Sequence, residues 1–347
     1  MKKKILSLLL TVVLCVGLMP GAKAAYSDVP SDHWAAVSIE RATELGIFNG
    51  IGNGQFGFGQ KISRASFVTA LVRLFGWKTV APDRATFTDV KKGEWYYSAV
   101  ETAAANGALP VSSQNFRPSD SLSRGEMAAM LMRALGYTSL ASAVSKFECP
   151  FSDVTTNKGF IILAYDMGIV AGRGDGTFAP NEAATREQAA TLLVRLHDRL
   201  HQESTALASA TGWTQLRVKS PEAVQGAEMP TTPLEPIIEL YQQLRSIKNS
   251  GLGTGRVALV LRAGGIRTIV SNEGEIISSE PIDRAELDRI FANNSVRTYY
   301  SQRYESAYGV YQPNYYQTVT VWYQSEESLA VKLQLARMFG VTHYVLE

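Results

Sequence analysis

Three short stretches of one kind, spaced almost evenly along the first 200 residues, constrain the fold of this chain most strongly. They are residues 63–66 (SRAS), 123–126 (SRGE) and 185–188 (TREQ), and their arginines lie 60 and then 62 residues apart. Each stretch opens an apolar run with helical spacing. A motif that recurs at a fixed period indicates a repeat architecture, in which one repeat cannot bury its apolar face alone and must pack on the others.

Each copy also opens with a motif of an aromatic residue, a small residue, aspartate and valine. The three openings are residues 26–29 (YSDV), 87–90 (FTDV) and 151–154 (FSDV). A hydroxyl residue followed by aspartate predicts the start of a helix, because the side-chain oxygens can accept the unpaired N–H groups of a first turn. The glycines expected to end these first helices are Gly46, Gly107 and Gly168.

The arginine motifs themselves predict the start of a second helix in each copy. Ser123 with Glu126, and Thr185 with Gln188, fit a capping box, while copy one has Ser66 in place of the acid. The second helices are expected over residues 67–75, 127–135 and 189–196. The sequence therefore predicts three helix-turn-helix hairpins that pack together.

The arginine directly after each N-cap suggests a binding role. A guanidinium group beside the positive end of a helix, with spare N–H donors, suits a carboxylate or phosphate on a ligand. The same arginines could instead brace loops. Residue chemistry leaves both roles open for Arg64, Arg124 and Arg186.

Residues 26–200 resemble three S-layer homology (SLH) repeats, because the aspartate opening, a central tryptophan, the glycine turn, a Gly-x-Phe loop and the arginine motif recur in order. The resemblance implies an all-α domain, a pseudo-threefold helical bundle. Its grooves between repeats would bind secondary cell-wall polysaccharide, often pyruvylated, and so anchor a protein to a wall of the Gram-positive type.

The resemblance also implies which residues line the grooves. Trp34 and Trp95 each lie six residues after the aspartate of their copy, whereas Gly159 occupies that place in copy three, so the third groove is expected to be incomplete. Core packing is the alternative role for the tryptophans. The residues expected to bind polysaccharide are Asp28, Trp34, Arg64, Asp89, Trp95, Arg124, Asp153 and Arg186.

The first residues have the features of a secretory signal. Residues 1–24 combine a lysine-rich start, an apolar run and an Ala-x-Ala end. Their removal would take away four lysines and no acids, changing the formal net charge from +2 to −2, which does not indicate nucleic-acid binding. Cys149 would then be the single cysteine, so no internal disulfide is expected. His197 and His201 lack a third ligand, and neither a metal nor a cofactor is predicted.

The rest of the chain divides by composition. The expected segments are a signal peptide (1–24), repeats at 25–80, 81–145 and 146–200, a linker at 201–232, and a smaller α/β domain at 233–347. In that domain the sequence predicts helices over 237–247, 283–291 and 326–339, and strands over 257–261, 266–270, 318–323 and 342–346. The first two strands are expected to pair across Gly264 and Gly265.

This last domain resembles the closing segment of a family 18 glycoside hydrolase barrel. The resemblance rests on residues 233–236 (PLEP), 321–323 (VWY), 328–332 (SLAVK) and 339–341 (FGV), and it departs at Tyr344, where that family has tryptophan. The Asp-x-x-Asp-x-Asp-x-Glu motif that supplies the acid in that family occurs nowhere in the chain. Glycoside hydrolysis needs two carboxylates, so a binding or structural module is predicted rather than an enzyme.

Three functions follow as hypotheses. The first is a secreted cell-surface protein, associated with the S-layer, that binds secondary cell-wall polysaccharide, without nucleic acid and without a membrane span once the signal is removed. The second is a wall-anchored, chitinase-like hydrolase acting on cell-wall or chitin-like glycans, with carboxylates drawn from Glu273, Glu275 or Glu305. The third is a structural protein whose last domain mediates lattice contacts.

Overall fold

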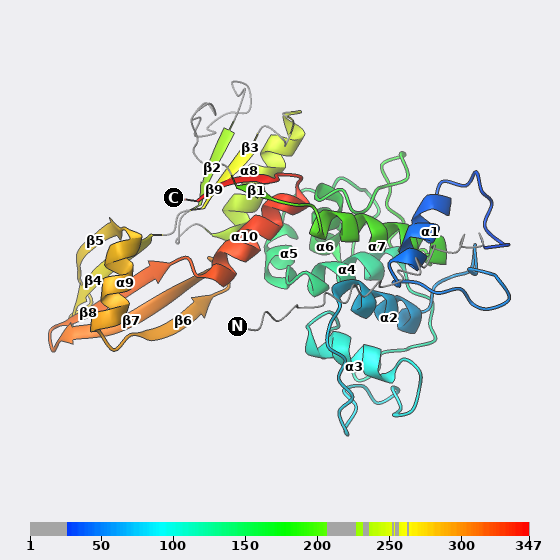
Figure 1. Cartoon of the computed structure of the whole chain (residues 1–347), viewed down its shortest axis with the longest axis horizontal. Coiled ribbons are helices and arrows are strands. Elements are labelled where there is room, and N and C mark those ends of the chain that lie inside the picture. Colours follow the sequence, from blue (N-terminus) through cyan, green and yellow to red (C-terminus); the bar gives the residue numbers. More distant parts are fainter. Residues whose placement is uncertain are drawn as a thin grey trace, which may run out of the picture.

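The computed structural model describes residues 26–206, 227–231, 236–251, 253, 257–261 and 264–346. In Figure 1 the helices before residue 200 form one body, and two sheets with their own helices follow it. The expected signal segment and the stretch around Trp213 lie outside the described residues. Within the described ranges, no helix combines the length and the apolar character needed to cross a membrane.

Each copy contributes a pair of helices. The pairs are α1 (Ala36–Glu44) with α2 (Arg64–Phe75), α3 (Tyr97–Ala105) with α4 (Arg124–Ala134), and α6 (Lys158–Asp166) with α7 (Arg186–Leu200). A short helix that the sequence did not predict, α5 (Thr138–Val144), lies between α4 and α6. The prediction of a helical part followed by an α/β part is confirmed.

The second helix of each copy begins where the arginine motif predicts. The Ser63 hydroxyl accepts the N–H three residues later at 3.2 Å. Ser123 does the same, and the Glu126 carboxylate accepts the Ser123 N–H at 3.1 Å, which completes a capping box. The Thr185 N–H donates to the Gln188 side chain at 3.2 Å. Local cap chemistry therefore sets these three helix starts.

The three copies interlock in a cyclic order. The first helix of each copy packs on the second helix of another, so that α1 contacts α7, α3 contacts α2 and α6 contacts α4. The motifs are joined by backbone hydrogen bonds from Ile62 N–H to the Ala184 carbonyl (2.9 Å), from Ala184 N–H to the Leu122 carbonyl (2.8 Å) and from Leu122 N–H to the Ile62 carbonyl (2.9 Å). These bonds form a closed ring, in which each copy donates to one neighbour and accepts from the other.

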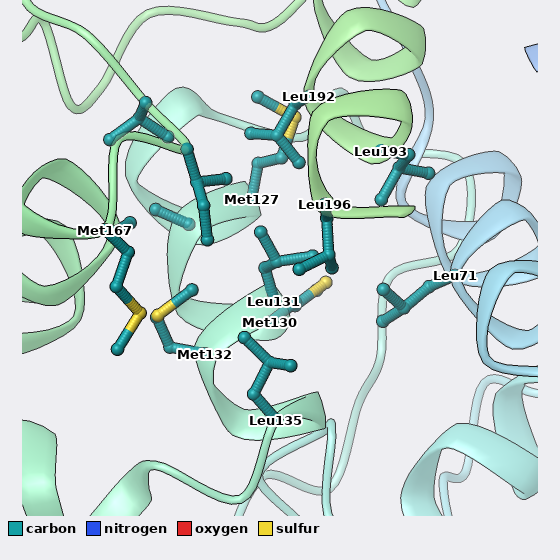
Figure 2. Packing of buried hydrophobic residues seen from close by; sticks show 14 of the residues in the cluster. Leu71, Met127, Met130, Leu131, Met132, Leu135, Met167, Leu192, Leu193 and Leu196 are labelled. Carbon is teal, nitrogen blue, oxygen red and sulfur yellow. The ribbon is translucent and has the colours of Figure 1, made fainter. Parts of the chain in front are cut away.

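The apolar centre of the helical part lies where α2, α4 and α7 meet (Figure 2). Leu71, Leu131 and Leu193, one from each of these helices, are fully buried. Met130 and Met132 of α4 are also buried, and flexible thioether side chains can fill irregular gaps between branched ones. Full burial of a leucine side chain stabilises the folded state by about 2 kcal/mol, so this centre holds the copies together as one unit.

A four-stranded parallel sheet opens the α/β part. Its order is β1 (Thr205–Ala206), β9 (His343–Leu346), β3 (Val257–Leu261) and β2 (Ala227–Thr231). The helices of this layer are α8 (Ile237–Asn249) and α10 (Glu326–Met338). The linker expected over 201–232 therefore contains two strands. Such short strands, one of which includes Pro230, carry no period-two pattern that a sequence can reveal.

A five-stranded antiparallel sheet is inserted between β3 and α10. Its order is β5 (Ile276–Ile282), β4 (Gly265–Ser271), β8 (Gln317–Tyr323), β7 (Ser306–Asn314) and β6 (Arg297–Ser301). Helix α9 (Arg284–Asn293) packs its Leu287 and Ile290 on one face of this sheet.

The predicted pairing of residues 266–270 with 257–261 is wrong. Strand β4 pairs with β5 and β8, whereas β3 pairs with β2 and β9. A Cβ atom on Gly265 would lie 2.6 Å from the Trp322 carbonyl oxygen. This glycine therefore permits the close approach of β8 and does not turn the chain back onto β3.

The helical and α/β parts share a continuous core. Tyr241 of α8 is fully buried, and its hydroxyl donates to the buried carboxylate of Asp166 on α6. The Arg245 Nε atom lies 3.0 Å from the same carboxylate, and Phe147 and Phe339 pack on the Tyr241 ring. Burial raises the pKa of Asp166, although the hydroxyl and guanidinium groups oppose that effect. The α/β part is thus docked on the third copy.

Candidate functional site

The three aspartates of the opening motifs hold the loop between the two helices of their own copy. Asp28 accepts the N–H groups of residues 56–58 at 2.7 to 2.9 Å. Asp89 and Asp153 each accept two N–H groups at the equivalent loop positions, at 2.7 and 2.8 Å. Burial acts to raise the pKa of Asp28, but these backbone hydrogen bonds outweigh it and the pKa is lowered. The Phe178 N–H is the main cause of the lowered pKa of Asp153.

The prediction that these carboxylates cap the first helices is therefore wrong. The residues before α1, α3 and α6 make no side-chain cap hydrogen bond. In the loops, the residue after each phenylalanine has a positive φ: 84° at Gly57, 60° at Arg117 and 55° at Ala179. Such a backbone turns consecutive N–H groups toward one point and forms an anion-binding concavity, which the aspartate fills.

Each motif arginine reaches into the loop of another copy. The Nε atom of Arg64 donates to the Phe116 carbonyl at 2.7 Å, and the guanidinium lies 5.2 Å from the centre of the same ring. The equivalent contacts join Arg124 to Phe178 at 2.9 Å and Arg186 to Phe56 at 2.9 Å. Burial lowers the pKa of all three arginines. The bracing role is thus present in every copy.

Bracing does not use the whole guanidinium group, and the copies differ in what the other nitrogens contact. Arg124 and Arg186 donate to carbonyl oxygens, those of Ala171 at 3.0 Å and Asn49 at 3.1 Å. Arg64 instead forms an ion pair with Glu126 at 2.6 Å. A carbonyl contact leaves the positive charge uncompensated, so anion binding stays open at Arg124 and Arg186.

Both tryptophans are on the surface. The exposed fraction is 60% for Trp34 and 64% for Trp95. Core packing, the alternative role considered for these side chains, is therefore excluded. An exposed indole presents a large apolar face that can pack against a ligand.

A pocket brings one tryptophan and one motif arginine together. Its volume is about 290 Å³, and it takes residues from all three copies. Trp34 comes from copy one and Arg124 from copy two, while copy three supplies the loop at residues 169–173 and the exposed Arg195 of α7. Across the pocket Arg173 forms an ion pair with Glu182. The walls thus combine an apolar ring with several cationic groups.

The grouping differs from the one expected, which placed the groove residues copy by copy. Arg195 lies nine residues after its motif arginine, as do Arg73 and Arg133. The pocket is described at Trp34; carrying the cyclic helix contacts to the other copies, and counting residues from the aspartates, groups the remaining residues into two corresponding sets. The three sets are the Trp34 groove (Trp34, Arg124, Arg195), the Trp95 groove (Trp95, Arg186, Arg73) and the Gly159 position (Gly159, Arg64, Arg133).

This cyclic grouping changes which groove is incomplete. The copy that lacks a tryptophan contributes its first helix to the position of Arg64, not to that of Arg186. No local sequence signal reveals this, because each motif arginine lies 90 or more positions from the tryptophan or glycine of its set. The short-range signals locate the residues, and the ring of copies decides which of them meet.

The S-layer homology domain model matches residues 25–68, 86–128 and 150–190. Among curated relatives, the chain is 32% identical over 177 residues to "Exoglucanase XynX" of Acetivibrio thermocellus, covering 49% of this chain and 16% of that protein. It is 25% identical over 231 residues to "S-layer protein sap" of Bacillus anthracis, covering 64% of this chain and 28% of that protein. The chain therefore spans less than a third of either relative.

Among solved structures, the C-terminal domain of a putative chitinase from Desulfitobacterium hafniense has a TM-score of 0.31 and 17% identity, covering 36% of this chain and 42% of that chain. This TM-score is too low to assign any part of the chain to that fold. The family model and the surface-layer relatives, in contrast, agree with the three motif copies. The chain thus carries three S-layer homology repeats and is a secreted surface protein associated with the cell wall.

Proposed function

We propose that the chain anchors a secreted protein to the bacterial cell wall without a covalent bond, by binding secondary cell-wall polysaccharide between its S-layer homology repeats. The Trp34 groove carries this proposal, because it places an exposed indole beside Arg124 and Arg195. The indole offers an apolar face to a sugar ring, and guanidinium groups bind carboxylates such as the ketal-linked pyruvate of a pyruvylated glycan.

The eight residues identified in the sequence have two roles in this proposal. Trp34 and Trp95 pack on sugar rings, and Arg124 and Arg186 brace the loops and present positive charge to the polymer, whereas Arg64 braces its loop and is paired with Glu126. The aspartates hold the loops in place, because their carboxylate oxygens accept hydrogen bonds from the backbone N–H groups of the loops. The aspartates therefore act through the loops and do not contact the glycan.

A pseudo-threefold arrangement of repeats at 25–80, 81–145 and 146–200 is part of the same proposal. The closed ring of backbone hydrogen bonds between the motifs supports it, as do the cyclic helix contacts. Grooves that face one polymer network act together, because after the first is filled the second binds at a high effective concentration. Modest affinity at each groove then suffices for retention on the wall.

We further propose that the domain at 233–347 is displayed and is not catalytic. Glu273 and Glu275 lie in the exposed turn between β4 and β5, beside Tyr315 and Tyr316. Glu305 precedes β7, at its opposite end. A nine-residue strand is about 30 Å long at ~3.4 Å per residue. Hydrolytic carboxylate pairs lie about 5 to 10 Å apart, which argues against a pair drawn from these acids.

One observation favours the hydrolase alternative enough to test it. Burial raises the pKa of Glu305, and Tyr300 donates to this carboxyl group at 2.8 Å. A raised pKa suits a general acid. We expect the purified chain to leave a chromogenic N-acetylglucosamine substrate intact; turnover that disappears in Glu305→Gln would establish the alternative.

Co-sedimentation with purified cell walls tests the anchor. The full chain should pellet with intact walls and stay in solution with walls stripped of their polysaccharide. The double variant Trp34→Ala, Arg124→Ala should lose at least tenfold in wall binding. The control is Tyr316→Ala, which removes a 74% exposed aromatic residue from the distant β7–β8 turn and should bind as the parent does. Equal binding to stripped and intact walls would contradict the proposal.

A further inference from the structure

We infer that this chain binds wall polysaccharide at two places, the Trp34 groove and the Trp95 groove, and that the Gly159 position is a closed junction that carries the α/β part. This inference rests on the proposed wall-anchoring function and goes beyond it, because it assigns unequal roles to three positions that the repeats make equivalent. Three independent differences at the Gly159 position support it, and a fourth observation explains why the position is closed.

The first difference is the missing indole. Gly159 takes the place of the tryptophans when residues are counted from the aspartate, but copy three is three residues shorter here, so Gly159 lies inside α6, and Thr156 is the residue two before this helix, as Trp34 and Trp95 are before α1 and α3. A Cβ atom built on Gly159 would lie 1.8 Å from the Ala141 carbonyl oxygen and 3.1 Å from the Ser145 nitrogen. The backbone of α5 therefore lies against this position. Not even a methyl group fits at Gly159, so the start of α6 is packed against α5, and Thr156, two residues before α6, offers no aromatic ring to a sugar.

The second difference is charge compensation. Arg64 is about as buried as Arg186 (8% and 9% exposed), but its guanidinium forms an ion pair with Glu126 at 2.6 Å, while Arg117 contacts the same carboxylate at 3.2 Å. The residue equivalent to Glu126 is Gln188 beside Arg124 and Ser66 beside Arg186, and both are neutral. An anionic sugar could reach Arg64 only by displacing a carboxylate that belongs to the protein.

The third difference concerns the second arginine of each set. Arg195 and Arg73 are exposed, and Arg195 lines the open pocket. Arg133, their equivalent at the Gly159 position, is half-buried, and its guanidinium lies 4.4 Å from the centre of the Phe160 ring. Burial lowers the pKa of Arg133. The cation that would face a ligand is here covered by an aromatic ring of the same copy.

The α/β part explains the closure. Helix α5 contacts α6 on one side and α8 on another, so the helix that fills the Gly159 position is also the surface on which α8 docks. Figure 1 shows α5 toward the sheets, α1 on the far side of the helical part, and α3 at its lower edge. Trp34 and Trp95 lie two residues before α1 and α3. Both indoles therefore remain exposed while the α/β part is held at the third position.

Counting the sites tests the inference. The probe is a charged oligosaccharide of one repeating unit, released from purified wall polysaccharide and titrated calorimetrically into the full chain. The parent should bind two molecules per chain. Trp34→Ala and Trp95→Ala should each bind one, and the double variant none. Tyr315→Ala, which removes an 82% exposed aromatic ring from the distant sheet, should still bind two.

The closed position is tested separately with Glu126→Gln. The amide keeps the capping box but removes the charge that neutralises Arg64, and we expect the variant still to bind two molecules, because this position has no exposed indole and its Arg133 is covered by the Phe160 ring. Three sites in the parent, or a third site gained in Glu126→Gln, would overturn the closed junction. A single site in the parent would overturn the two-groove assignment. No binding by any folded variant would instead contradict the anchoring function.

Discussion

The Nε atom of Arg186 donates to the carbonyl oxygen of Phe56 at 2.9 Å, across 130 residues of chain. This bond joins the third copy to the first, and with the Arg64 and Arg124 bonds it completes one turn around the three copies. The guanidinium also lies 4.9 Å from the centre of the Phe56 ring. The Arg186 side chain thus closes the ring of copies, and the same side chain is the one that we propose to bind ligand. One residue therefore contributes to both stability and function.

Removing the Arg186 side chain should destabilise the fold as well as the Trp95 groove. In Arg186→Ala the Phe56 carbonyl loses a buried charged donor, which costs about 2 kcal/mol in the free energy of unfolding. Urea denaturation followed by circular dichroism measures the change. Arg41→Ala, which removes a surface arginine with a 48% exposed side chain, should stay within about 0.5 kcal/mol of the parent. An equal effect in both variants would contradict the bracing role.

Acid should weaken the loop of the first copy through Asp28. The pKa of this carboxylate is lower in the folded than in the unfolded chain, so its contribution to stability is present above the unfolded value of about 3.9. That contribution is lost as the pH falls through the folded value. Carboxylates titrate between about pH 5 and pH 2. Over this range the thermal midpoint of the parent should therefore drop more steeply than that of Asp28→Asn. Parallel curves would rule out this source of pH dependence.

Two glycine substitutions separate a packing effect from a backbone effect. Gly159→Ala places a methyl group inside the backbone of α5 and should cost about 3 kcal/mol or prevent folding. Gly46→Ala meets no atom within 4 Å, but the φ of 67° at this residue is strained for alanine, at a cost of about 1 kcal/mol. If Gly159→Ala is as stable as the parent, α5 does not pack tightly against the start of α6.

The docking of the α/β part should depend on Tyr241. Tyr241→Phe removes the hydroxyl that donates to the buried Asp166 carboxylate, leaving that charge with one partner fewer, at a cost of about 1 to 3 kcal/mol. We expect faster limited proteolysis between the two parts and a lower thermal midpoint. Tyr299→Phe, a change at a 47% exposed tyrosine on β6, provides the control. Unchanged proteolysis in Tyr241→Phe would show that the hydrogen bond does not hold the junction.

Sequence reasoning located the elements of the helical part because their signals are local. The starts of α2, α4 and α7 follow from cap residues that satisfy N–H groups within the same turn. Helix α5 escaped detection because it is seven residues long, and β1 and β2 were too short to show periodicity. The sequence does contain a sign that other elements cover α6. Residues 160–164 of this helix are all apolar, as expected of a helix that is covered on several sides.

The sequence by itself determined that three helical hairpins exist, where each second helix starts, and which aspartates, arginines and tryptophans recur. Tertiary structure alone decided that Asp28 holds a loop rather than a helix end, that Arg124 and Trp34 of another copy line one pocket, and that α5 packs against Gly159. The physical reason is range. Caps and turns are satisfied within a few residues, whereas a groove forms only where separate copies are brought together by burial of their shared apolar faces.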